Sequence, residues 1–337
     1  MTPTLPLKNI KIIDFTRLLP GPLGTHLLSQ MGAEIFKIES PKRLDGTRYF
    51  QAKKNEVSPL YHSLNHTKNQ CLIDYETREG YQKIVKMIQT AAVFIEQFRP
   101  GVMKAFQLDY ETVKQINPNI VYISITGYGQ MATKSHKAGH DLNFIAENGL
   151  LSLNKDASGT PIIPGFQLAD IAGGSYQLVA ACTTGLLAQK LHQKPQFVDL
   201  SLCDASASLA VIPNAMLDGG LSYQKTPILS GMLANYNVYQ CEDKKWIVLA
   251  ALELKFWNLF CEIIDKPTWK TDTLDTLVVG VFDKKKLDDF FNTKPRDFWM
   301  KLFKNQDVCL SGVLELEELE MDQTNGRYKA PFNCFEG

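Results

Sequence analysis

One histidine and one aspartate stand out because of the residues around them. His140 follows Ala138-Gly139 and precedes Asp141, in a turn after a predicted strand, whereas Asp170 opens a long apolar helix. A histidine has an unperturbed pKa of about 6.5, so it can abstract a weakly acidic proton near neutral pH. An aspartate presented from a separate element could return a proton on the opposite face of the same carbon. The pair therefore predicts acid–base work at one carbon atom.

Each of these residues also has an ordinary structural interpretation. A histidine beside a glycine is commonly a turn residue, and an aspartate that begins a helix is commonly its N-cap. Gly173 and Gly174 follow Asp170 in the first turn of the helix. Glycine costs about 1 kcal/mol relative to alanine inside a helix, so two together indicate that a ligand or another helix approaches closely.

Composition limits the class of protein. The 337 residues are 45% hydrophobic and carry a formal net charge of zero, which predicts a large core and no general attraction for nucleic acid or anionic membranes. We find no apolar stretch of about 18 residues and no signal peptide, so we expect no membrane span and a cytoplasmic protein. The seven cysteines lack C-x-x-C spacing and the six histidines lack ligand spacing, which predicts free thiols and no metal site.

Strand and helix patterns alternate through the first half of the chain. A strand at Asn9–Phe15 precedes a helix at Leu23–Met31 and a strand at Glu34–Glu39. The alternation continues through a strand at Leu72–Tyr75 to a strand at Ile120–Thr126. This predicts an α/β fold, with a Rossmann-like, mostly parallel sheet covered on both faces. Because neither G-x-G-x-x-G nor a P-loop follows a strand, the sequence argues against NAD, FAD or hydrolysed nucleotides.

The pattern changes in the second half. We expect a large domain over 1–212, a linker over 213–230 and a small α+β domain over 231–304, with 305–337 returning to the large domain. A hairpin is predicted at Asn235–Cys241 and Lys245–Ala251, followed by a helix from Glu253. Ligands of parallel sheets bind at the carboxyl ends of the strands, where segments such as Arg17–Pro22 are expected.

Several short motifs occur in an order that resembles the family III CoA-transferase (CaiB/BaiF) superfamily. They are Ile12–Arg17 with Pro20-Gly21-Pro22, Met31–Glu34 leading into Lys37-Ile38-Glu39, Phe98–Val102, and Gly127–Gln130. Within that superfamily, Ala138–Asp141 and Ala250–Glu253 are similar to segments of the α-methylacyl-CoA racemases. Phe144 stands where those racemases often carry tyrosine.

The resemblance implies a function and a set of site residues. His140 and Asp170 would exchange acid and base roles on a 2-methyl-branched acyl-CoA through an enolate, and Glu253 would orient His140. Backbone N–H groups after Asp170 would face the thioester oxygen, with room left by the small side chains at 172–174. The implied substrate or CoA contacts are Lys37, Ser40, Ile73, Asp74, Tyr75, Glu76, Arg99, Gly139, Asp141, Asn143 and Phe144.

The resemblance also implies an interlocked homodimer in fatty acid and lipid metabolism. CoA would be part of the substrate, and no separate cofactor is expected. Arg99 is a candidate for a CoA phosphate or an ordinary surface ion pair, while Lys37 and Lys68 are weaker phosphate candidates.

Two rival functions remain open. In a family III CoA-transferase, Asp170 would be the nucleophile that forms an anhydride and then a CoA thioester, which leaves His140 without an evident task. A non-catalytic acyl-CoA binder is disfavoured because His140, Asp170 and Glu253 are all present.

Overall fold

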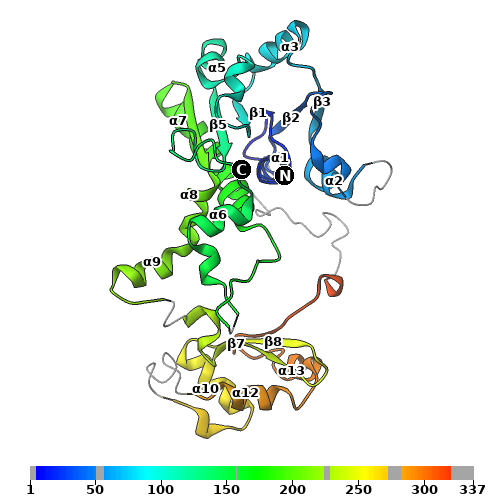
Figure 1. The fold of residues 1–337 in the computed structure, drawn as a ribbon. Helices are drawn as coiled ribbons and strands as arrows, with labels where there is room; N and C mark the ends of the chain where they lie inside the picture. Colours follow the sequence, from blue (N-terminus) through cyan, green and yellow to red (C-terminus); the bar gives the residue numbers. More distant parts are fainter. Residues whose placement is uncertain (1–4, 51–56, 157, 224–227, 272–281, 320–337) are drawn as a thin grey trace. The chain divides into compact units, whose positions relative to one another are not determined.

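The computed structural model describes residues 5–50, 57–156, 158–223, 228–271 and 282–319. The chain divides into two compact units, the first containing Met1–Val211 and the second Ile212–Lys329 (Figure 1).

A parallel sheet forms the centre of the first unit. Within the described residues it has six strands in the order β3-β2-β1-β4-β5-β6, and every neighbouring pair is parallel. The strands are β1 (Lys11–Asp14), β2 (Glu34–Glu39), β3 (Asn69–Leu72), β4 (Val93–Glu96), β5 (Val121–Thr126) and β6 (Gln196–Ser201). The predicted α/β class with a mostly parallel sheet is confirmed. The third strand was expected at Leu72–Tyr75 and instead ends at Leu72.

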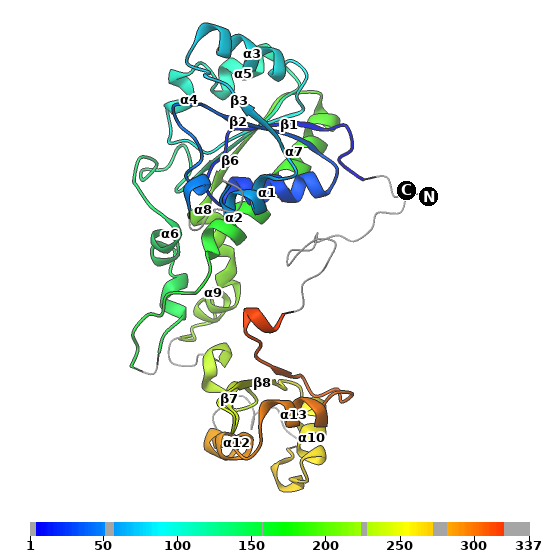
Figure 2. The ribbon, with the colours of Figure 1, turned by 90° about the vertical axis from the view of Figure 1, so that its right-hand side faces the viewer.

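Helices cover both faces of this sheet. In Figure 2, α3 and α5 lie on one side of the strands, and α1 and α7 lie on the other. The helices of the unit are α1 (Pro20–Gln30), α2 (Pro59–Asn65), α3 (Arg78–Ile88), α4 (Val102–Ala105), α5 (Tyr110–Ile116), α6 (Asp141–Glu147), α7 (Gln177–His192) and α8 (Leu202–Ala207), with shorter turns at η1 (Gly46–Tyr49) and η2 (Leu150–Leu153).

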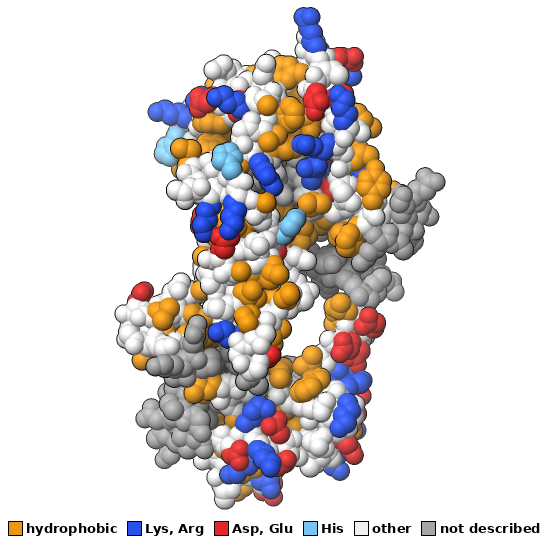
Figure 3. Space-filling model, viewed as in Figure 1, with side chains coloured by type: hydrophobic (Ala, Val, Ile, Leu, Met, Phe, Trp, Pro, Cys, Tyr) orange, Lys and Arg blue, Asp and Glu red, His pale blue; other side chains and the backbone are white. Residues whose placement is uncertain are grey.

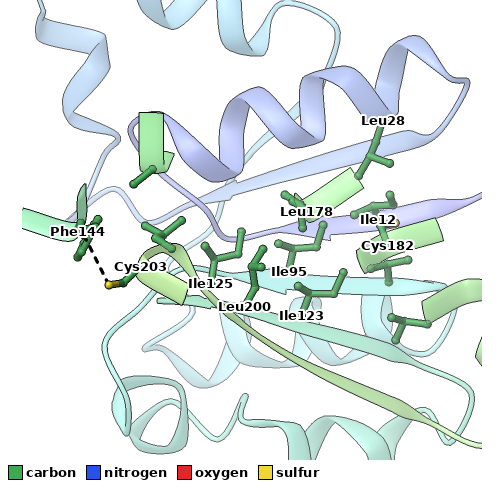
Figure 4. Packing of buried hydrophobic residues seen from close by; sticks show 14 of the residues in the cluster. Ile12, Leu28, Ile95, Ile123, Ile125, Phe144, Leu178, Cys182, Leu200 and Cys203 are labelled. Atoms are coloured by element: carbon green, nitrogen blue, oxygen red, sulfur yellow. Dashed lines mark hydrogen bonds between the residues drawn. The ribbon is translucent and has the colours of Figure 1, made fainter. Parts of the chain in front are cut away.

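Two hydrophobic clusters fill the space between the sheet and these helices. Alternate residues of a strand point to opposite faces, so Ile12 joins one cluster and Ile13 the other. Figure 4 shows the first cluster, in which Leu28 of α1 and Leu178 of α7 pack over Ile12 and its neighbouring strands. β3, the strand at one end of the sheet order among the described residues, is largely exposed.

The long helix that begins near Asp170 has two parts. Its first turns, η3 (Ala169–Tyr176), are π-helical, and α7 continues them to His192. A Cβ added to Gly173 would lie 2.7 Å from the Leu202 carbonyl oxygen of α8, and one on Gly174 would lie 2.7 Å from Cβ of Pro20. The glycines therefore admit a neighbouring helix and loop. The expectation that residues 172–174 leave room for a thioester is wrong for these two positions.

The expectation that the chain lacks a long apolar segment is also wrong. Ala169–His192 is long and apolar enough to cross a membrane by length and composition. Core helices of soluble proteins pass the same test, and here Gly185 of this helix packs against Val121 of β5.

An antiparallel sheet organises the second unit. Within the described residues, β7 (Tyr236–Gln240) pairs with β8 (Trp246–Ala250), which pairs with β9 (Leu310–Gly312). An aromatic core that includes Trp257, Phe260 and Trp299 lies between this sheet and its helices. These are α10 (Leu254–Ile263), α12 (Lys284–Phe291) and α13 (Arg296–Leu302), with shorter turns at η5 (Ile228–Met232), η6 (Pro267–Trp269) and η7 (Leu316–Glu318). The turn η4 (Ser208–Ala210) ends the first unit and leads into α9 (Val211–Asp218), which begins at the boundary.

The second unit differs from expectation at two places. The predicted linker over 213–230 contains most of α9, because Pro213 is accommodated in the first turn of that helix. The segment from 305 was expected to return to the large domain, but Leu310–Gly312 pairs with β8 of the small sheet instead. Residues 320–337 of that segment lie outside the described part of the chain.

Candidate active site

A cavity of about 490 Å³ opens in the first unit, a size typical of sites for small organic ligands. Its walls include residues that directly follow β1, β4 and β5, such as Arg17, Gln97 and Gly127. It therefore lies at the carboxyl ends of the strands, as expected for a parallel sheet. His140, Asp170, Arg99, Gly139 and Phe144 of the predicted site all line it.

His140 is the N-cap residue of α6 and is exposed. Its backbone N–H donates to Oδ1 of Asn143 at 3.1 Å, and the Asn143 N–H donates back to the His140 carbonyl oxygen at 2.8 Å. Asn143 therefore orients the backbone of the histidine. His140 lines the cavity, where its imidazole can meet a ligand.

Asp170 lies in the first turn of η3 and is half-buried. Its backbone N–H donates to Oδ1 of Asp141 at 3.0 Å, which joins the starts of α6 and η3. Burial, assisted by the negative charge of Asp141, raises the pKa of Asp170 to about 6. A carboxyl group with this pKa exchanges protons readily near neutral pH. Asp141 was predicted as a substrate contact. In the structure its carboxylate accepts the Asp170 N–H, and its negative charge helps to raise the Asp170 pKa.

The backbone N–H groups after Asp170 are less available than predicted. The Asp170 N–H already donates to Asp141, and the Ile171 N–H donates to the Gln167 carbonyl oxygen at 3.3 Å. These two donors are therefore engaged within the chain and do not face the cavity as a free pair.

Gly127 and Gly139 leave room for the ring of Phe144. The ring is 3% exposed, and a Cβ added to Gly127 or Gly139 would lie 2.6 Å or 2.7 Å from its Cε1 atom. The ring also meets Tyr128 edge to face, with centroids 5.3 Å apart. Phe144 thus packs the loop after β5 against the loop that carries His140.

A buried ion pair supports the loop after β1. The ammonium group of Lys37 contacts Oδ2 of Asp45 at 3.1 Å and donates to the Thr16 carbonyl oxygen, and both ionic side chains are fully buried. The Asp45 carboxylate also accepts the N–H of Leu18, at 3.2 Å to each oxygen. Leu18 has a φ of 65°, which is unfavourable for leucine, so these contacts stabilise an unusual turn at the wall of the cavity.

A second buried pair lies behind the same loop. Nζ of Lys68 is 3.4 Å from Oδ2 of Asp14 and also donates to the Pro22 carbonyl oxygen. Burial lowers the pKa of Lys68 to about 7, while burial of Asp14 is outweighed by Lys68 and Lys37, which lower its pKa. Lys37 and Lys68 therefore hold the scaffold of the site in this structure.

Several other predicted contacts lie outside the cavity lining. Tyr75 is buried between Phe15 and Phe106, with ring centroids 5.3 Å and 5.2 Å away. Asp74 and Glu76 lie near the surface, and both pair with Lys42. Ser40 is buried and its hydroxyl accepts the Lys42 N–H, while the Ile73 N–H donates to the Glu39 carbonyl oxygen.

Glu253 belongs to the second unit. It is the exposed N-cap residue of α10, and its carbonyl oxygen accepts the N–H groups of Phe256 and Trp257 at 3.1 Å. Its predicted action on His140 stays a prediction.

Sequence reasoning missed three basic residues of the cavity wall, Arg17, Arg43 and Lys137. Arg17 was noted only as part of a segment at the end of a strand, and Arg43 had no signal because it lies in a loop between elements. A positive charge directly after a predicted strand could have marked Arg17.

Comparison with known proteins agrees with this architecture. The model of the CoA-transferase family III matches residues 7–329. The chain is 30% identical over 315 residues to human succinyl-CoA:glutarate CoA-transferase, covering 90% of this chain and 70% of that protein. It is 28% identical over 321 residues to human alpha-methylacyl-CoA racemase, covering 93% and 79%. The chain therefore belongs to CoA-transferase family III.

Solved structures share the fold. Rv3272 from Mycobacterium tuberculosis superposes with a TM-score of 0.79 at 23% identity, covering 94% of this chain and 85% of that one. A CaiB/BaiF family protein from Brucella suis gives a TM-score of 0.78 at 24% identity, covering 93% and 85%. The relatives of this chain thus include both CoA-transferases and racemases.

Proposed function

We propose that the protein racemises a 2-methyl-branched acyl-CoA thioester by moving the proton on the α-carbon. The observation that carries this proposal is that His140 and Asp170 line one cavity from two separate elements, α6 and η3. Two acid–base groups presented from different elements suit removal of a proton on one face of a carbon and its return on the other.

The two groups would exchange roles with the direction of the reaction. For one enantiomer, the imidazole of His140 takes the α-proton, and the protonated carboxyl of Asp170 delivers a proton to the opposite face of the enolate. For the other enantiomer, the Asp170 carboxylate is the base and the imidazolium of His140 is the acid. The raised pKa of Asp170, about 6, supports both roles because each protonation state is accessible near neutral pH.

Proton NMR in deuterated water tests the reaction directly. Incubation of one enantiomer of 2-methylbutanoyl-CoA with the enzyme is expected to place deuterium on the α-carbon and to produce both configurations. Retention of the α-proton and of the starting configuration would refute racemisation.

CoA transfer is the second candidate, and the half-buried Asp170 carboxylate with the transferase relatives favours it. Asp170 would attack the thioester carbonyl carbon, expel CoA thiolate and form a mixed anhydride. The thiolate would then attack the aspartyl carbonyl carbon, release the carboxylic acid and leave an aspartyl–CoA thioester. Detection of that adduct by mass spectrometry, with CoA passing to an added carboxylic acid, would replace the racemase proposal.

We also propose a homodimer. Large apolar side chains are exposed along α7 and α9, including Leu191 at 68%, Val211 at 66% and Leu217 at 58%, and Figure 3 shows apolar side chains at the surface over α9. Exposed apolar surface of this kind commonly marks an interface. Light scattering coupled to size-exclusion chromatography should give twice the mass of the 37.9 kDa chain.

A further inference from the structure

The segment that leads to His140 is exposed and forms part of the cavity wall. Residues 131–139 connect the loop after β5 to α6, and most of them are exposed. Four of them line the cavity, namely Ser135, Lys137, Ala138 and Gly139. Exposed segments with few buried contacts open readily, so the position of His140 depends on what holds this segment.

One carboxylate holds the segment. Within the part of the chain that the structure describes, every hydrogen bond and ion pair that leaves residues 131–139 runs to Glu147, the last residue of α6. Nζ of Lys134 donates to its Oε2 atom at 2.7 Å, and Nζ of Lys137 donates to its Oε1 atom at 2.5 Å. The hydroxyl of Tyr128, in the loop after β5, donates to the same Oε1 atom at 2.8 Å. Glu147 therefore ties three points of the chain between β5 and His140 to α6.

The helix that carries Glu147 is fixed to the core of the first unit. Phe144 of α6 belongs to the buried cluster of Figure 4. At the end of α6, the amide of Asn148 donates to the Cys203 carbonyl oxygen at 2.9 Å and to Oγ of Ser206 at 2.8 Å, both in α8. Glu147 can thus hold the exposed segment against a well-supported helix.

The stability of α6 gives no reason for a carboxylate at this position. The C-terminal end of a helix is the negative end of its dipole, where a negative charge is unfavourable. Donation from Lys134, then from Lys137 and Tyr128, lowers the pKa of Glu147 to about 2, so the group is ionised near neutral pH. The segment, and not the helix, therefore compensates this charge.

We propose that Glu147 is a positioning residue for His140, because its carboxylate anchors residues 131–139 on α6 and so holds the imidazole at the cavity. Glu147 is not among the residues that line the cavity, so it acts through His140. This inference rests on the proposed function, since it takes His140 as a catalytic group. Exposed ion pairs contribute little to global stability, so loss of the anchor should appear in local order and in catalysis.

Hydrogen exchange followed by mass spectrometry tests the anchor without any reaction. The Ser135 and Lys137 N–H groups donate to carbonyl oxygens within the segment, at 2.9 Å and 2.8 Å. In Glu147→Gln they should exchange about 10-fold faster, as expected for the loss of two surface ion pairs on one carboxylate. Glu111→Gln, which removes an exposed ion pair with Lys114 on α5, is the matched control and should leave their exchange unchanged. Unchanged exchange in Glu147→Gln would overturn the inference.

A double-mutant cycle tests whether the anchor acts through His140. Glu147→Gln should reduce deuterium wash-in at the α-carbon of 2-methylbutanoyl-CoA about 10-fold, because a small displacement of a catalytic group can cost up to about 100-fold. In a His140→Ala background, Asp170 still exchanges the proton on its own face, and the same substitution should have little further effect. Equal reductions in the two backgrounds would overturn the inference.

The two readouts separate the anchor from the proposed function. Lys134→Met removes a partner of Glu147 that does not line the cavity, and it should speed hydrogen exchange of the segment without adding to the effect of Glu147→Gln. A wild-type enzyme that leaves the α-proton in place would refute racemisation, while faster hydrogen exchange in Glu147→Gln would still support the anchor. Racemisation together with normal hydrogen exchange in Glu147→Gln would keep the function and overturn the anchor.

Discussion

Two groups of charged side chains lie at the carboxyl edge of the parallel sheet and differ in their partners. In the buried network behind the β1 loop, Asp14 pairs with Lys68 and Asp45 pairs with Lys37, and all four side chains are fully buried. In the cavity wall, Arg17, Arg43 and Arg99 form no ion pair with any described residue. Asp170, the only acidic residue among the described lining, has a raised pKa.

The difference shows which charges serve folding and which serve a ligand. A buried charge is tolerated only with a partner, so each member of the network depends on the other members. Within the described residues the three arginines of the cavity wall have no ion pair, as we expect if a ligand supplies their counter-charge. Removing a network charge should therefore reduce stability, whereas removing a cavity charge should reduce catalysis or binding.

The largest effect is expected at Asp170. Asp170→Asn should reduce α-proton exchange about 10²- to 10⁴-fold, the range found for general acid–base groups, because the amide cannot exchange a proton. Deuterium wash-in by NMR measures the rate, and a urea unfolding curve close to wild type is the control. Full-rate racemisation by this variant would remove Asp170 from the mechanism.

The buried network should respond in the opposite way. Lys68→Met leaves the Asp14 carboxylate buried without its main counter-charge, which should lower the free energy of unfolding by about 3–5 kcal/mol. Urea denaturation measures the change. The control is Lys42→Met, whose exposed pairs with Asp74 and Glu76 should change the free energy of unfolding far less. Equal losses in both variants would contradict the distinction between the two regions.

Asp141 offers a finer test inside the cavity. Asp141→Asn keeps an oxygen that can accept the Asp170 N–H but removes the negative charge that helps to raise the Asp170 pKa. The pKa of Asp170 should fall below about 6, so the limb of the pH–rate profile that reports ionisation of this carboxyl should move to lower pH. An unmoved limb would show that Asp141 does not act on Asp170 through its charge.

The last test concerns Glu96 and the pH dependence of stability. Burial raises its pKa to about 7 from the usual 4.5. Between these two pH values the folded chain holds a proton that the unfolded chain releases, so this group makes stability decrease as pH rises through the window, by at most about 1.4 kcal/mol per pH unit. In Glu96→Gln that component should disappear, as followed by thermal unfolding from pH 4.5 to 7. Exposed Glu79→Gln is the control, and an unchanged slope in Glu96→Gln would contradict the buried titration.

The sequence by itself determined the α/β class, most elements of the sheet and the pairing of His140 with Asp170 as candidates. Apolar periodicity and turn residues are local signals, so strands such as Glu34–Glu39 were placed correctly. The family resemblance then identified His140 and Asp170, which are thirty residues apart in the chain, as a candidate catalytic pair.

Only the tertiary structure decided which charges are free. Lys37 and Lys68 looked available for phosphate, yet the fold brings Lys68 to Asp14, 54 residues away, and buries both pairs. Arg17 and Arg43 drew no prediction as single residues, yet both lie beside the Phe98 ring and neither forms an ion pair within the described residues. Charge pairing depends on contacts between residues distant in the chain, and the periodicity of one sequence contains no record of those contacts.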